Sequence, residues 1–267
     1  MEQTEAPEFI PAPLPLRLPV APAVPRLGLI GCGAFGGLIA PRLAGRFALA
    51  VHDPARDGSQ PLEEVASADI VVLAVPLAAL AETAEAISPH LRPGALVVDV
   101  CSVKLTPLRL LEELLPAHVA LVGSHPLFGP KSFGPGARVV LCPARGGRGL
   151  AAVRRWLRRE GMTVLVRTAE AHDRDMALAQ GITHMVGRIV AALSPEPDGK
   201  HGMTTPSFEH LLTATGMVAG DAQGVFETIQ RDNPFVAAIQ QRFFAAAEAL
   251  RGELAGVSPA APAAPPR

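Results

Sequence analysis

Seven short apolar runs, separated by helix-compatible stretches, constrain the fold of this chain more than any other feature. The runs consist mainly of valine, isoleucine, leucine and alanine, and they lie at residues 27–30, 48–52, 70–75, 95–100, 119–122, 139–141 and 163–166. Such runs suit strands that are buried on both faces of a sheet, and their alternation with helices indicates parallel βαβ crossovers. The pattern predicts an α/β fold with a doubly wound, Rossmann-type parallel sheet.

The character of the sequence changes after residue 167. Residues 169–193 contain no proline and no strand-like run, a polar break follows, and helix-like stretches cover 208–220 and 222–254, with Pro234 opening the last helix. We therefore expect an α/β domain at 26–167 and a smaller all-helical domain at 168–257. The proline-rich ends, 1–25 and 258–267, are predicted to be disordered tails, because such segments favour extended conformations and lack the apolar content of a core.

Composition excludes several classes of protein. Lys+Arg 24 against Asp+Glu 25, with no tyrosine and one tryptophan, argues against nucleic-acid binding, which needs clustered basic charge and stacking aromatics. Three widely spaced cysteines, Cys32, Cys101 and Cys142, suit neither a disulfide framework nor a metal site. No signal peptide and no uninterrupted apolar run of membrane-spanning length is evident. We expect a cytoplasmic protein with reduced thiols and with no metal, nucleic-acid or membrane partner.

A glycine-rich loop directly follows the first apolar run. Its sequence, Gly31-Cys-Gly33-Ala34-Phe35-Gly36, has the spacing of a dinucleotide-binding turn. The first glycine permits a tight turn, the second lets the backbone approach a pyrophosphate, and the third lets the helix pack on the strand. We predict that these residues bind a dinucleotide at the helix N-terminus, which makes 26–167 the dinucleotide-binding domain. A glycine-rich turn without a ligand is the alternative.

Two residues after the second run bear on the choice of dinucleotide. Asp53 lies where a carboxylate binds the adenosine ribose and repels a 2′-phosphate, which favours NAD. Arg56 lies three residues on, and its guanidinium would instead suit the 2′-phosphate of NADP. NAD is the predicted cofactor, and NADP remains the alternative. A turn capped by Asp53 without a cofactor role is a further alternative.

Three later motifs add a site to this loop. They are Asp99-Val-Cys-Ser102-Val-Lys104, then Gly123-Ser-His125-Pro-Leu-Phe-Gly-Pro, then Glu-Ala-His172-Asp173 leading to Gln180-Gly-Ile-Thr-His184. Together with the loop, they resemble the prephenate/arogenate dehydrogenase family of tyrosine biosynthesis, over nearly all of residues 27–254. The segment from Phe208 onward is most similar to the plant-type arogenate branch.

Ser102 and His125 each follow an apolar run. If these runs are parallel strands, both side chains emerge at carboxyl ends, where doubly wound sheets bind ligands. A neutral histidine there can accept the proton of an alcohol while hydride leaves its carbon for a nicotinamide. The resemblance implies oxidative decarboxylation of prephenate, to 4-hydroxyphenylpyruvate, or of arogenate, to tyrosine. His125 would be the base for the ring hydroxyl, with Ser102 orienting its imidazole and the cofactor amide.

Further residues are candidates for binding the substrate. Lys104 either positions a substrate carboxylate or caps the following helix. Gln180 and His184 lie four residues apart on one face of the predicted helix, together with His172. The resemblance implies that His184 faces the active site across an interdomain cleft, whereas a buried core histidine is the alternative.

The specificity clues conflict. Many prephenate-specific members carry an arginine that binds the substrate side-chain carboxylate, and the corresponding stretch here, residues 211–218, contains none. Plant-type relatives generally prefer NADP, whereas this chain has Asp53. The sequence therefore leaves prephenate and arogenate open. The resemblance also implies a homodimer through the helical domain, for which the apolar 235–254 segment is suited; packing within its own domain is the alternative.

Two other functions compete with this interpretation. Another two-domain hydride-transfer enzyme, of the β-hydroxy-acid dehydrogenase or imine reductase type, is the first. A β-hydroxy-acid dehydrogenase would be expected to carry a lysine on the long helix, and residues 169–193 contain none. A non-catalytic dinucleotide sensor or scaffold is the second, and it would have no use for Ser102 and His125.

Overall fold

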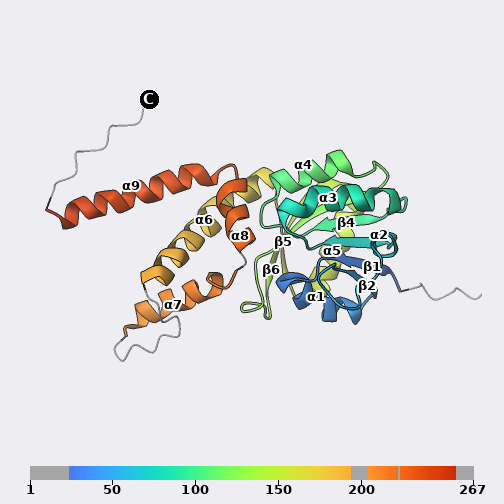
Figure 1. Cartoon of the computed structure of the whole chain (residues 1–267), viewed down its shortest axis with the longest axis horizontal. Helices are drawn as coiled ribbons and strands as arrows, with labels where there is room; N and C mark the ends of the chain where they lie inside the picture. The colour runs from blue at the N-terminus through green and yellow to red at the C-terminus, as the bar shows by residue number, and fades with distance from the viewer. Residues whose placement is uncertain (1–23, 194–203, 222, 257–267) are drawn as a thin grey trace, which may run out of the picture.

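A computed structural model of the whole chain describes residues 24–193, 204–221 and 223–256. The predicted tails, 1–25 and 258–267, lie outside the described residues except for Val24 and Pro25, and the polar break after residue 193 lies outside them as well. Within the described ranges the chain forms an α/β half and a helical half, with the helical half extending to one side (Figure 1). The change falls between strand β7, which ends at Val166, and helix α6, which begins at Ala169.

All seven predicted strands are present and form one sheet in the order β2-β1-β3-β4-β5-β6-β7. Their bounds are β1 Arg26–Ile30, β2 Ala48–His52, β3 Ile70–Leu73, β4 Leu96–Asp99, β5 Ala120–Pro126, β6 Arg138–Arg145 and β7 Thr163–Val166. Neighbours from β2 to β5 pair in parallel. The Rossmann-type α/β fold is confirmed.

The direction of the last two strands differs from the prediction. β6 pairs antiparallel to β5, and β7 pairs parallel to β6. A parallel crossover needs a connection of a dozen or more residues, usually a helix. The described segment between β5 and β6, residues 127–137, has no helix, so the chain turns back and pairs directly. β5 therefore includes Gly123-Ser-His125-Pro126, the first part of the His125 motif, and His125 pairs with Val140 of β6.

Helices cover both faces of the sheet, which explains the continuous apolar runs (Figure 1). Val71 and Leu73 of β3 pack in one apolar layer, and Val72 packs in the other. The first layer lies under α2 Leu62–Ala66, α3 Leu77–Ile87 and α4 Leu105–Leu114; the second lies under α1 Ala34–Ala44 and α5 Gly147–Arg159. A short 3₁₀ turn, Ser88–His90, follows α3.

The helical half is built around α6, Ala169–Leu193. Helices α7 Pro206–Val218 and α9 Val236–Leu254 pack against it, and between them lie α8 Gln223–Glu227 and a π-helical turn, Thr228–Asp232. α7 begins two residues earlier than predicted because Thr205 caps it, accepting a hydrogen bond from the Phe208 amide. Pro206 occupies its first turn, where the missing N–H has no cost.

α6 is long and apolar enough, by length and composition alone, to cross a membrane. Its apolar run is interrupted by polar residues such as Gln180 and His184, and the expectation of no membrane partner stays a prediction. Its composition has another explanation in the fold. The helix buries His172, Asp173 and His184 together with the small residues Ala177, Gly181 and Gly187. Small residues let neighbouring helices approach closely: a Cβ on Gly187 would lie 2.5 Å from a Val218 methyl carbon on α7.

Candidate active site

The glycine-rich loop has the shape that a dinucleotide needs. Gly31 has φ +91°, and a Cβ on it would lie 2.4 Å from the Ala74 carbonyl oxygen. A Cβ on Gly36 would lie 2.2 Å from the Gly31 carbonyl oxygen, whereas one on Gly33 would have nothing within 4 Å. No side chain caps α1 at Gly33, so its first amides, beginning with Ala34 and Phe35, are available to an anion. These residues fit a pyrophosphate.

Substitutions in this loop separate ligand contact from packing. We expect Gly33→Ala to leave the melting temperature unchanged and to weaken dinucleotide binding by about tenfold, or about 1.4 kcal/mol, because the added methyl occupies only the ligand's path. Gly36→Ala, the matched variant, is expected to lower the melting temperature, because its methyl meets backbone. Calorimetry and dinucleotide titration check both. Unchanged affinity in Gly33→Ala contradicts the assigned path.

Asp53 and Arg56 both lie beside this loop. The Asp53 carboxylate accepts hydrogen bonds from the Cys32 amide at 2.6 Å and the Ala55 amide at 3.0 Å. These backbone bonds, that to Cys32 first, lower the pKa of Asp53 below its usual value, so the group is a carboxylate at neutral pH. The exposed Arg56 guanidinium contacts the Cys32 sulfur. Both residues that were expected to choose between NAD and NADP therefore lie next to the loop.

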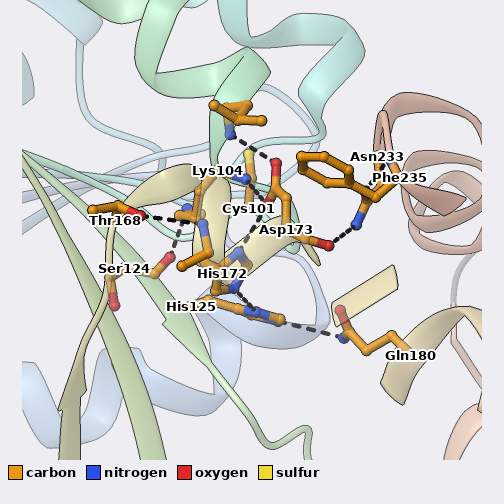
Figure 2. Close-up of polar contacts among 12 residues, drawn as sticks. Cys101, Lys104, Ser124, His125, Thr168, His172, Asp173, Gln180, Asn233 and Phe235 are labelled. Atoms are coloured by element: carbon orange, nitrogen blue, oxygen red, sulfur yellow. Dashed lines mark hydrogen bonds and ion pairs between the residues drawn. The ribbon is translucent and has the colours of Figure 1, made fainter. Parts of the chain in front are cut away.

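His125 lies at the carboxyl end of β5 and is 3% exposed. Its Nδ1 is 2.8 Å from Nε2 of His172, and its Nε2 is 3.4 Å from Nε2 of Gln180 (Figure 2). Burial, followed by the charges of His172 and Lys104, holds the pKa of His125 well below its usual value of 6.5. His125 is therefore neutral near pH 7, as a proton acceptor must be.

Lys104, for which a substrate contact and a helix cap were both open, lies in the core at the start of α4. Its side chain is completely buried, and its Nζ donates to the Asp99 carboxylate at 2.6 Å and to the Ser124 carbonyl at 2.8 Å. A Cβ on Gly123 would lie 3.1 Å from Cδ of Lys104, so that glycine leaves the room the side chain occupies. The Lys104 ammonium points into the core and pairs there with Asp99, and the residue lies at the N-cap of α4. Binding of substrate by Lys104 stays a prediction, which this pairing does not favour.

Ser102 is half-buried between β4 and α4. Among the described residues, no hydrogen bond joins it to His125; Nδ1 of that ring is bonded to His172 instead. The expected orienting partner of the imidazole is thus a residue of α6 rather than Ser102. A contact between the Ser102 hydroxyl and the cofactor stays a prediction.

The structure brings Gln180 to His125, and it places His184 one turn further along α6. His184 is 6% exposed, and its Nε2 is 3.8 Å from the Asp221 carboxylate. Burial is the main cause that lowers the pKa of His184. Lys131, from the loop after His125, donates to the Gly216 carbonyl on α7 at 3.0 Å. Binding of substrate by Gln180 and His184 stays a prediction.

Side chains of the segment 127–137, which follows the strand of His125, contact helix α1. Phe128, three residues after His125, lies with its ring centroid 6.1 Å from that of Phe35 at the start of α1. Arg42 of α1 lies over the Phe133 ring, 4.1 Å from its centroid. The His125 motif therefore packs against the helix that begins the dinucleotide loop.

A neutral histidine on the same carboxyl edge of a Rossmann-type sheet as a dinucleotide loop, and next to Gln180 of the helical half, is the arrangement of a two-domain oxidoreductase. Residues 46–166 match the family described as "Prephenate dehydrogenase, nucleotide-binding domain". The chain is 30% identical over 223 residues to a 4-amino-4-deoxyprephenate dehydrogenase of Streptomyces pristinaespiralis, covering 82% of this chain and 72% of that protein. The chain belongs to the prephenate/arogenate dehydrogenase family.

Other relatives agree with this assignment. Arogenate dehydrogenase 1 of Arabidopsis thaliana is 30% identical over 177 residues, covering 62% of this chain and 27% of that protein. The fold is similar to that of a prephenate dehydrogenase from A. aeolicus, solved with hydroxyphenyl propionate and NAD+, with TM-score 0.65 and 20% identity over 87% of this chain and 92% of that one. The chain spans about half the length of several curated relatives that it matches.

Proposed function

We propose that this protein oxidises a prephenate-type cyclohexadienol with a nicotinamide dinucleotide, in tyrosine biosynthesis. The observation that carries the proposal is His125: a buried imidazole that is neutral near pH 7, at the carboxyl end of β5 and beside Gln180 of the helical half. A binding protein without catalysis has no need of such a group. α6 also lacks the lysine expected of a β-hydroxy-acid dehydrogenase.

The chemistry assigned to the chain is the acceptance of one proton. The bound dinucleotide supplies the hydride acceptor. Nε2 of His125 takes the proton of the ring hydroxyl as hydride leaves the ring carbon that bears this hydroxyl. The bond between the ring and its carboxylate then breaks and CO2 leaves. The electron pair of that bond makes the ring aromatic, and the ring oxygen takes the proton back from His125. The buried setting of His125 keeps water away from the acceptor nitrogen.

Three substrates and two cofactors separate the open alternatives. Prephenate and arogenate, each with NAD and with NADP, are followed by the absorbance of the reduced nicotinamide, and 4-amino-4-deoxyprephenate is added because a relative is named for it. The ionised Asp53 supports a preference for NAD, and the absence of arginine from α7, Pro206–Val218, supports arogenate over prephenate. No turnover of any substrate by a folded sample overturns the proposal and favours another hydride-transfer reaction or a dinucleotide sensor.

The low pKa of His125 predicts the pH dependence of turnover. The neutral imidazole is the active form, so kcat/KM is expected to rise with pH through the pKa of His125 and to level off above it. Because burial places that pKa well below 6.5, activity at pH 6.5 is expected to be close to that at pH 7.5. Initial rates between pH 4.5 and pH 8 check this. An acid limb centred above pH 6.5 contradicts it.

We also propose a homodimer through the helical half. Most of α9 is exposed in the single chain, including Phe244 at 59%, Leu250 at 55% and Leu254 at 81%. A helix so little covered gains little stability from its own domain, and most helical stability comes from packing. Light scattering is expected to give about twice the chain mass of 27.8 kDa, and Phe244→Glu to shift it toward that of one chain. A wild-type monomer overturns this proposal.

The remaining expectations on partners and location stay predictions. Four arginines gather on α5, namely Arg154, Arg155, Arg158 and Arg159. Local basic charge is thus present on α5 despite the overall balance.

A further inference from the structure

A continuous chain of hydrogen bonds leads from the start of α4 to His125. The carboxylate of Asp173, on α6, accepts from the backbone amides of Lys104 at 2.7 Å and Leu105 at 2.9 Å. The same carboxylate lies 2.7 Å from Nδ1 of His172. Nε2 of His172 lies 2.8 Å from Nδ1 of His125 (Figure 2). Asp173 and His172 are 0% and 1% exposed, so water does not replace these partners.

The chemistry of the groups gives the direction of each bond when His172 is neutral. An ionised carboxylate only accepts hydrogen bonds, and here it is anchored by two backbone donors at a helix N-terminus. Nδ1 of His172 then carries a proton and donates it. With His172 neutral, its Nε2 offers a lone pair, which accepts from Nδ1–H of His125. Because His125 is itself neutral, its remaining nitrogen, Nε2, is then without a proton.

Gln180 borders the remaining nitrogen of His125. Its amide nitrogen lies 3.4 Å from Nε2 of His125, and with the amide in this orientation the contact is compatible with a lone pair on Nε2. The side-chain oxygen of Gln180 is buried and has no hydrogen-bond partner among the described residues. The face of His125 that looks toward α6 therefore presents an acceptor, bordered by an amide with hydrogen-bonding capacity to spare.

We propose that His172 and Asp173 are positioning residues that hold His125 in the one tautomer able to act as a base. This inference rests on the proposed function. When Nε2 of His125 takes the substrate proton, the new positive charge is shared through Nδ1–H with His172 and, beyond it, with the Asp173 carboxylate. Asp173 itself stays ionised, and the protons on Nδ1 of His172 and Nδ1 of His125 stay where they are. The helical half thus supplies the orientation of a base that the α/β half carries.

Two variants of His172 and one control test the positioning role. His172→Leu removes the acceptor and leaves His125 free to carry its proton on either nitrogen; we expect kcat to fall by about 10²- to 10³-fold, with KM changing much less. His172→Gln returns an acceptor oxygen near the place of Nε2, and it is expected to restore kcat to within about tenfold of wild type. Asn233→Ala, the control, removes the bond from Asn233 to the Asp173 carbonyl, 2.7 Å long, and is expected to lower the melting temperature with little loss of kcat.

The tautomer itself is measured without any substrate. Nitrogen-15 NMR of histidine-labelled protein distinguishes protonated from unprotonated ring nitrogens, and His125→Asn assigns the signal. In the wild type we expect Nδ1 of His125 to be protonated and Nε2 to be bare, and we expect His172→Leu to lose this single state. A wild-type His125 protonated on Nε2 overturns the inference, and so does His172→Leu with unchanged kcat. Bare Nε2 in a protein that turns over no cyclohexadienol overturns only the proposed substrate and supports the assigned tautomer.

Discussion

His125→Asn is expected to lower kcat by about 10²- to 10⁴-fold, the range that a positioned general base contributes. Asparagine keeps an amide N–H near the place of Nδ1, so the bond to His172 (2.8 Å in the wild type) has a replacement and the fold is retained. What it lacks is the second nitrogen, Nε2, that takes the substrate proton. Steady-state kinetics with whichever of the three substrates the wild type turns over, together with a dinucleotide titration, check this result.

A matched histidine at the other end of the same strand serves as the control. His118 lies just before β5, and its Nε2 is 3.2 Å from the Leu91 carbonyl. His118→Asn is expected to keep kcat close to that of wild type. If His125→Asn retains full turnover, or loses turnover together with dinucleotide binding, His125 is not the base.

Lys104→Met is expected to have the largest effect on stability, about 3–5 kcal/mol, because it leaves a buried carboxylate without its partner. Lys104 and Asp99 are both completely buried and 2.6 Å apart. Asp99→Asn combined with Lys104→Met removes both charges while keeping an acceptor for the Cys101 amide, and it is expected to recover much of the loss. Denaturant unfolding of the wild type, Lys104→Met, Asp99→Asn and the double variant measures the coupling free energy between the two side chains.

An exposed ion pair gives the comparison. Arg174 and Glu170 are 2.7 Å apart, with side chains 63% and 62% exposed. Arg174→Ala is expected to change stability by less than about 1 kcal/mol, because solvent screens such pairs. A Lys104→Met variant no less stable than Arg174→Ala contradicts the account of the buried pair, as does a double variant no more stable than Lys104→Met.

The sequence predicted those parts of the fold that depend on neighbours along the chain. Each strand is a short apolar run. The three glycines are local signals as well: Gly31 permits the turn, Gly33 lets the backbone approach a pyrophosphate, and Gly36 lets the helix pack on the strand. The direction of β6 was not predicted, because an apolar run has the same composition whichever way it pairs. Only the missing helix in 127–137 indicated that the chain would turn back.

The candidate site was predicted in part. The motifs singled out His125, Gln180 and the glycine loop: His125 and the loop each lie at a strand end, and Gln180 lies on the long helix. The burial of Lys104 was not predicted, since its partner Asp99 lies five residues earlier and only the fold shows that the side chain turns inward. Asp173 went unassigned for a similar reason. Its carboxylate binds amides 68 and 69 residues away, and the one local signal was the His172-Asp173 pair at the start of a long helix.

The bonds from Asp173 to the first amides of α4 also have a mechanical consequence. They fasten the first turn of α6 to the α/β half, and Asn233 ties the start of α9 to the same turn. Any hinge between the two halves must therefore lie further along α6, beyond this turn. Movement about such a hinge alters the span from His125 to His184 while leaving His125 and His172 in register. A change in the distance from His125 to His184 would therefore leave the base undisturbed.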